Sequence, residues 1–98
     1  MARHLPTPVP APPLALTARE LGVLVRNARA RAQLRIDDAA ALAGVSSDLL
    51  SRLEHGKAVG SDKLLAVLSS LGLAMLVTDK RRADRLVSQL IREENRDE

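Results

Sequence analysis

The chain has 98 residues and a formal net charge of +3, and 46% of its residues are hydrophobic although Phe, Tyr and Trp are all absent. This length allows one small domain with a core of Leu, Val, Ile and Ala. Small domains bury a low fraction of their surface, and we expect one without aromatic residues to need a partner surface. Residues 1–60 hold eight Lys and Arg against five Asp and Glu, whereas residues 61–98 hold seven of each. A basic excess in the first part of the chain suits a phosphate-binding surface.

The features that the sequence lacks argue against several classes of function. It has no cysteine, and His4 and His55 are far apart, so we expect no disulfide, no metal site and no other cofactor. It has no nucleophile paired with a base and no glycine-rich phosphate loop, so we do not expect an enzyme. The longest apolar stretch, residues 71–77, is too short to span a bilayer, and prolines interrupt any signal peptide. A cytoplasmic location is therefore expected.

The N-terminal segment and the first predicted helix differ sharply in composition. Residues 1–15 contain all five prolines and cannot form a helix, so we expect a flexible tail, with a PxxP-type ligand as the alternative. Thr17 and Glu20 form a capping box, which predicts that a helix begins there and continues to about Gln33. Its apolar positions follow helical spacing; they are Leu21, Leu24, Val25, Ala28 and Ala32.

Residues 34–57 predict two short helices joined by a tight turn. The first covers about 36–43, and Gly44 supplies the turn. Ser46 caps the next helix, which continues to about His55. This pattern is typical of a helix-turn-helix, whose second helix enters the major groove of DNA.

The following segment predicts a fourth helix and then a strand. Ser61 caps the helix, which continues to Leu71, and Gly72 ends it. Residues 73–78 have no helical polar face and are interpreted as a strand, although continuation of a helix is the alternative. Because a lone strand leaves its backbone groups unpaired, we expect an antiparallel ribbon between two copies of the chain. The dimer residues would be Leu73, Met75, Leu76 and Val77.

An amphipathic helix is predicted over about residues 80–94. Its apolar stripe must pack against the chain's own core, a dimer partner or a separate protein; its members are Ala83, Leu86, Val87, Leu90 and Ile91. The predicted organisation is therefore a tail (1–15), a helix-turn-helix domain (16–72), a dimerising strand (73–78) and an amphipathic helix with a polar end (79–98).

Candidate DNA-contacting residues follow from the position of the third predicted helix. The base-facing set lies in its first two turns; it comprises Ser47, Asp48, Ser51 and Arg52. Arg52 could bind guanine with two hydrogen bonds, and Asp48 could accept one from cytosine or simply stabilise the helix dipole. Phosphate contacts are expected from the amides at the start of the second helix and from four side chains. These are Arg35, Ser46, His55 and Lys57.

Three stretches of the chain resemble the lambda-repressor-like, or Xre-type, helix-turn-helix family, and HipB-like antitoxins most of all. They are ELGVLVRNAR, LAGVSSDLLSRLEHGK and KLLAVLSSLGLAMLV. The resemblance implies a mainly helical bundle with a dimerising strand, and a structural ion pair between Arg29 and Glu54. It departs from the family pattern at the start of the second helix, where Arg35 and Ile36 replace a hydroxyl residue and a Gln. The cap is then expected to shift to Asp37.

The resemblance also implies a function. It predicts a homodimeric transcriptional repressor on bacterial DNA, associated with the nucleoid, that binds a palindromic operator and restrains a HipA-like kinase toxin. One alternative is a free-standing phage-type repressor or a HigA-type antitoxin of a ribonuclease toxin. Another is a protein-interaction module that has lost specific DNA binding. The operator, the identity of the toxin and the role of the proline-rich N-terminus do not follow from the sequence.

Overall fold

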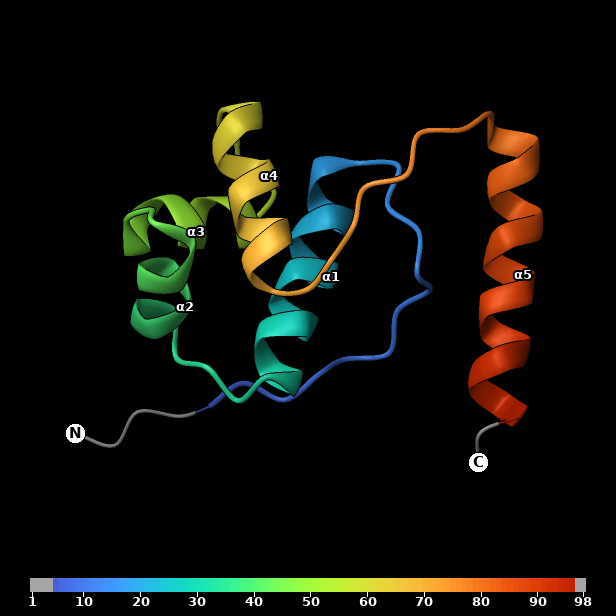
Figure 1. The fold of residues 1–98 in the computed structure, drawn as a ribbon, viewed down its shortest axis with the longest axis horizontal. Coiled ribbons are helices and arrows are strands. Elements are labelled where there is room, and N and C mark those ends of the chain that lie inside the picture. Colours follow the sequence, from blue (N-terminus) through green and yellow to red (C-terminus); the bar gives the residue numbers. More distant parts are fainter. Residues whose placement is uncertain (1–4, 97–98) are drawn as a thin grey trace.

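A computed structural model describes residues 5–96, which contain five helices. They are α1 (Ala18–Arg31), α2 (Ile36–Ala43), α3 (Ser47–Glu54), α4 (Ser61–Ser70) and α5 (Lys80–Arg96). Helices α1 to α4 form one cluster, and α5 stands apart from it at the end of an extended connection (Figure 1). No helix in this part of the chain is long and apolar enough to cross a membrane.

The helix starts confirm two of the predicted caps. The Thr17 hydroxyl accepts a hydrogen bond from the Glu20 amide at 3.1 Å, and the Glu20 carboxylate accepts one from the Thr17 amide at 3.1 Å. Together they form the capping box that the sequence predicts for α1. The Ser46 hydroxyl accepts from the Leu49 amide at 3.0 Å and caps α3 as predicted.

Two other predicted caps are wrong. Helix α4 begins after Gly60, so Gly60 is the N-cap residue and Ser61 is the first residue of the helix. A capping side chain belongs to the residue before the helix, so Ser61 does not cap α4. Helix α2 begins after Arg35, whose backbone is extended and whose side chain makes no capping bond, so the cap does not shift to Asp37. The helical bounds of α2 are nevertheless the predicted ones, because Gly44 ends it in a left-handed conformation with φ 73°.

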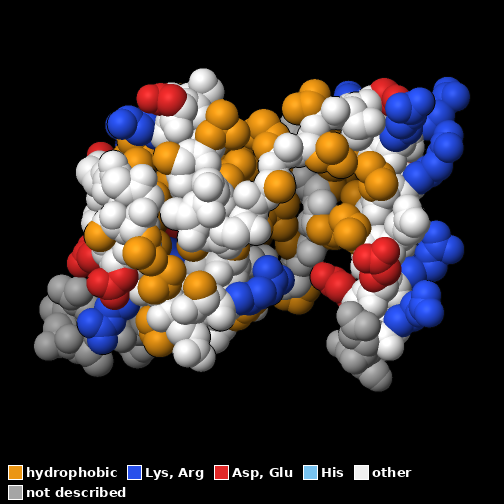
Figure 2. Space-filling model, in the orientation of Figure 1, with side chains coloured by type: hydrophobic (Ala, Val, Ile, Leu, Met, Phe, Trp, Pro, Cys, Tyr) orange, Lys and Arg blue, Asp and Glu red, His pale blue; other side chains and the backbone are white. Residues whose placement is uncertain are grey.

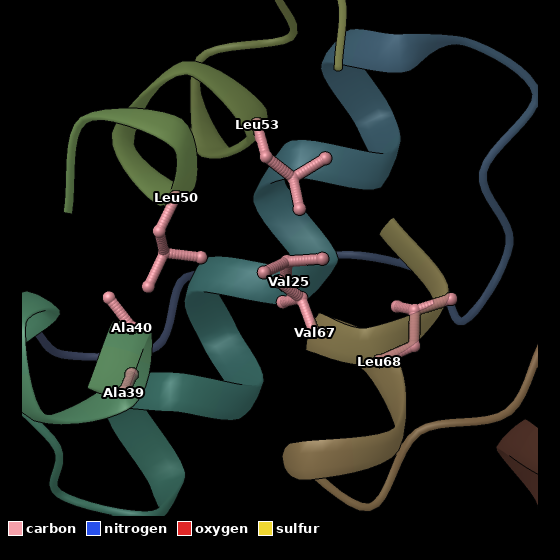
Figure 3. Close-up of a cluster of buried hydrophobic side chains, with 7 residues drawn as sticks. All are labelled: Val25, Ala39, Ala40, Leu50, Leu53, Val67 and Leu68. Carbon is pink, nitrogen blue, oxygen red and sulfur yellow. The ribbon is translucent and has the colours of Figure 1, made fainter. Parts of the chain in front are cut away.

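The core lies where α1 to α4 meet. Its buried side chains are aliphatic, as a chain without aromatic residues requires, and Figure 3 shows that they come from all four helices. They are Val25, Ala39, Ala40, Leu50, Leu53, Val67 and Leu68. The alanines of α2 permit close packing, and Gly22 of α1 does the same toward α3. A Cβ on Gly22 would lie 2.5 Å from the Glu54 carbonyl oxygen.

The N-terminal strap, residues 5–15, is extended as its prolines predict, but it lies along α1 instead of forming a free tail (Figure 1). Asn27 of α1, only 1% exposed, binds the strap through its side-chain amide. Its carbonyl accepts from the Val9 amide at 2.9 Å, and its NH2 group donates to the Val9 carbonyl at 2.8 Å. These two bonds have the pattern of one hydrogen-bonded pair in a β-ladder. The position of Asn27 in the helical pattern of the sequence does not predict them. Residues 1–4 of the expected tail lie outside the described part of the chain.

The predicted dimerising strand is absent. The connector, residues 73–79, carries no strand, and Leu73, Met75, Leu76 and Val77 lie in this irregular stretch between α4 and α5. Leu73 instead donates its amide to the Leu68 carbonyl at 2.8 Å, which closes the end of α4. A strand exists only when its backbone groups pair with a second strand, and no segment within residues 5–96 pairs with the connector.

Candidate nucleic-acid interface

Helix α3 is held by packing on one side and exposed on the other. Leu50 is 0% exposed and Leu53 is 3% exposed, and both enter the core between α1 and α2. Because residues four apart lie on one helix face, this packing turns Asp48 and Arg52 outward. The element therefore presents a polar face on a fixed support, as the helix-turn-helix pattern predicts.

A buried ion pair fixes α3 to α1. Arg29 Nε donates to Glu54 Oε2 at 2.7 Å, and Arg29 Nη2 donates to Glu54 Oε1 at 2.9 Å. Arg29 Nη1 also donates to the Leu34 carbonyl at 3.0 Å, so the same guanidinium holds the chain just before α2. The ion pair expected from the resemblance is therefore present, with side chains only 8% and 3% exposed. It compensates the negative charge of Glu54 at the end of α3.

The four residues of the predicted base-facing set lie together on α3, but they differ in their freedom. Asp48 and Arg52 are exposed, whereas Ser47 and Ser51 are half-buried. Ser47 donates its hydroxyl hydrogen to Asp37 Oδ1 at 2.8 Å, which links the first turn of α3 to the first turn of α2. The sequence pattern does not predict this hydrogen bond, because the two residues lie in different helices and share no periodicity.

Arg52 is exposed in the second turn of α3. One Nη2 hydrogen lies within reach of the Ala58 carbonyl at 3.5 Å, while the rest of the guanidinium is exposed. The loop after α3 thus restrains the side chain without consuming its other donors. A guanidinium held in this way can present two parallel N–H groups to the acceptors of a guanine.

The four predicted phosphate-contacting side chains are all exposed, but two of them already make local bonds. Ser46 caps α3, and His55 places Nδ1 2.7 Å from the Ser51 carbonyl. Because Nδ1 is engaged with that carbonyl, only Nε2 of the His55 ring is available to another group. No side-chain hydrogen bond of Arg35 or Lys57 is found among the described residues, and both side chains are exposed.

Charges of both signs lie around this surface. Arg35, Arg52 and Lys57 are exposed, but Asp37, Asp38 and Asp48 are exposed near the starts of α2 and α3. The first amides of α2 lack a capping side chain from Arg35 and can meet a phosphate, although the neighbouring carboxylates weaken that attraction. Residues 5–96 contain no cluster of three His, Cys, Asp or Glu side chains that could hold a metal ion.

The comparison with known families agrees with this geometry. Residues 20–74 match the family model described as a helix-turn-helix domain, which is more than half of the chain. The matched region begins at Glu20 in the first turn of α1 and ends in the connector, so it includes most of α1 and all of α2, α3 and α4. Among curated proteins, none matches the chain.

Proposed function

Because the chain belongs to the helix-turn-helix domain family, we propose that it is a sequence-specific transcriptional repressor that binds a palindromic operator as a homodimer. The observation that best supports this proposal is the outer face of α3, where Asp48 and Arg52 are exposed on a helix whose other face is locked into the core. A reading helix must hold its side chains in a fixed frame, because base discrimination depends on hydrogen-bond geometry.

In this proposal each residue has a defined role. Arg52 binds a guanine with two hydrogen bonds, and Asp48 selects cytosine or, without a base contact, stabilises the start of α3. Ser51 and Ser47 contact bases or phosphates, with Ser47 already oriented by Asp37. A second group of residues anchors the phosphates on either side of the groove; it comprises Arg35, Ser46, His55 and Lys57.

Binding to the promoter of the chain's own gene tests the proposal. With about six phosphate contacts, affinity measured by fluorescence anisotropy should fall roughly a thousandfold or more between 50 and 200 mM salt. Arg52→Ala should relax specificity at one base position in each half-site, losing about 1–3 kcal/mol of discrimination. Arg85→Ala on α5 is the matched control, because it removes the same charge from a helix outside the α1–α4 cluster. A flat salt response together with unchanged specificity in Arg52→Ala would rule out base reading by this helix.

The partner implied by the HipB resemblance is a second part of the proposal. The chain would act as an antitoxin that binds and restrains a HipA-like kinase toxin. Its support is the resemblance of KLLAVLSSLGLAMLV, residues 63–77, to the corresponding block of HipB-like proteins. Co-purification with the product of a kinase-sized neighbouring gene, and loss of that kinase's activity in the complex, would support it. A small ribonuclease gene in that place would favour the HigA-type alternative instead.

The observation that favours a second function is the acidic character near the reading face. Two exposed carboxylates, those of Asp38 and Asp48, lie near the starts of α2 and α3, and such charges repel phosphate. A protein-interaction module that keeps the fold would show this pattern without any DNA affinity. In that case the anisotropy measurement would give only weak binding at low salt, equal for operator and random DNA.

A further inference from the structure

The unexplained feature of this fold is the apolar stripe of α5. No residue of α5 is buried, although the helix is strongly amphipathic. Leu86, Leu90 and Ile91 remain 37%, 45% and 40% exposed. Figure 2 shows hydrophobic side chains along the side of α5 that is turned toward the rest of the chain, with Lys and Arg along its outer edge. A helix with one apolar face is stable in water only when that face is covered.

The connector that precedes α5 also exposes large apolar side chains. Met75, Leu76 and Val77 are 50%, 72% and 87% exposed. Of the large hydrophobic side chains that are exposed within residues 5–96, six of eleven lie after residue 74. Contiguous exposed apolar patches on small proteins mark interaction sites. The α1–α4 cluster does not cover this patch, so another molecule is needed.

The spacing of the stripe fits a second helix of the same kind. Positions 80, 83, 87, 90 and 94 alternate steps of three and four residues and so lie along one seam of the helix. Ala83, Val87 and Leu90 form the apolar middle of this seam, with Lys80 at its start and Glu94 at its end. Leu86 and Ile91 lie on its two flanks and widen it. A seam with this period packs against a matching helix by inserting side chains between those of the partner.

The opposite charges at the two ends of the seam favour a second copy of α5 as the partner, in the antiparallel direction. In an antiparallel pair of α5 helices related by a twofold axis, the Lys80 end of one copy meets the Glu94 end of the other, and the reverse contact forms by symmetry. A parallel pair would instead place Lys80 beside Lys80 and Glu94 beside Glu94. The antiparallel arrangement also opposes the two helix dipoles favourably.

We propose that α5 pairs with α5 of a second copy of this chain in an antiparallel two-helix interface, which the exposed connector residues 75–77 extend. This inference rests on the homodimer of the proposed function but assigns that dimer to α5. It makes α5 the element that joins two α1–α4 clusters, each with its own reading helix.

Sedimentation of the full chain in the absence of DNA tests the pairing. The chain should be a dimer, and Leu90→Glu should raise the dimer dissociation constant by at least about a hundredfold, because the substitution acts twice in a twofold interface. Gln89→Glu, on the polar side of the same helix, is the matched control and should leave the dimer unchanged. Urea denaturation should show that the α1–α4 cluster stays folded in both variants, since Leu90 is outside the core. Loss of the dimer in Leu90→Glu should lower only the helical circular dichroism signal of α5, whose apolar face is then uncovered. A monomeric chain, or a dimer that survives Leu90→Glu, would overturn the proposal.

A charge exchange tests the direction of pairing. Lys80→Glu and Glu94→Lys should each weaken the dimer, and the double variant should restore it, because each exchanged pair again has opposite signs. In a parallel pair the single variants exchange one like-charge contact for another and have no such effect. Failure of the double variant to restore the dimer would overturn the antiparallel orientation. These experiments use no DNA. If the chain forms the α5 dimer but does not bind the operator, the proposed function is refuted and the α5 pairing stands.

Discussion

Among the described residues, Arg29 and Glu54 are the only charged side chains that are buried, and their pairing decides their effect on stability. Both side chains are more than nine-tenths buried, and two hydrogen bonds of 2.7 and 2.9 Å join them. Such a pair stabilises a fold less than its Coulomb attraction suggests, because both ions have left water. Removal of one partner should lower the stability of the fold strongly, because the other is then a buried charge without a compensating partner.

We therefore expect Arg29→Met to lower the free energy of unfolding by about 3–5 kcal/mol in urea denaturation, because Glu54 stays buried and unpaired. The double variant Arg29→Met with Glu54→Leu should regain most of that loss. Arg82→Met is the control: its bridge to Asp79 is 3.5 Å long, with side chains 75% and 60% exposed, and its removal should cost less than about 1 kcal/mol. A double variant no more stable than Arg29→Met would contradict the argument.

Gly22 is a second position where a small change, the addition of a Cβ atom, should alter the stability of the fold. Alanine is favoured over glycine inside a helix by about 1 kcal/mol, so propensity alone predicts that Gly22→Ala stabilises α1. The added Cβ would lie 2.5 Å from the Glu54 carbonyl oxygen, however, and backbone cannot move aside cheaply. We expect a net loss of about 1–3 kcal/mol in thermal or urea unfolding.

Gly60→Ala is the matched control for Gly22→Ala. There the new Cβ would meet only the end of the Asp62 side chain at 2.9 Å, and that side chain can turn away. Gly60 is the N-cap of α4, where glycine is preferred to alanine, so the control should lose up to about 1 kcal/mol and less than Gly22→Ala. Equal stability of the two variants would show that α1 and α3 can separate at no cost.

At the scale of elements, local signals predicted the helices well and the irregular segments poorly. Helices α1 to α3 follow from a capping box, a hydroxyl cap and the left-handed Gly44, all of which act within a few residues. The strap and the connector depend on what lies beside them. Residues 73–78 have the composition of a strand but have no ladder partner, and composition does not reveal this.

The reading helix shows the same division between local and distant information. The position of α3 and the outward direction of Asp48 and Arg52 follow from its periodicity. The bond from Ser47 to Asp37 and the bond from Asn27 to Val9 connect separate elements, so no local spacing encodes them. Arg29 and Glu54 are also far apart in the sequence. Their ion pair could be predicted only because the chain resembles a family in which those positions pair.

The strap offers a test at the element scale. Asn27→Asp keeps the acceptor for the Val9 amide but places a carboxylate oxygen against the Val9 carbonyl, where the NH2 group now donates at 2.8 Å. We expect a loss of about 1–3 kcal/mol and faster amide hydrogen exchange across residues 5–15. Arg26→Ala removes only the 3.4 Å bond to the Thr7 carbonyl and should leave exchange nearly unchanged. Unaltered protection in Asn27→Asp would mean that the prolines alone hold the strap.

At the scale of the whole molecule, the chain divides into a packed cluster and an outlying helix. The core residues all come from α1 to α4, and the partly buried Leu71 and Leu73 complete the core just after α4. Helix α5 adds no buried residue. The α1–α4 cluster therefore contains the groups that determine stability and, in the proposed function, DNA reading, while α5 contributes association.

This division predicts the outcome of shortening the chain. A chain that ends at Thr78 should unfold within about 1 kcal/mol of the full chain, because no core contact is lost. The comparison must be made at a protein concentration where the full chain is monomeric, since dimerisation stabilises by mass action. A chain that ends at Ser70 loses Leu71 and Leu73 as well, and it should be less stable by about 2 kcal/mol or more. If ending the chain at Thr78 proved as damaging as ending it at Ser70, α5 would have to pack on its own cluster in solution, and its stripe would not be free to bind a second copy.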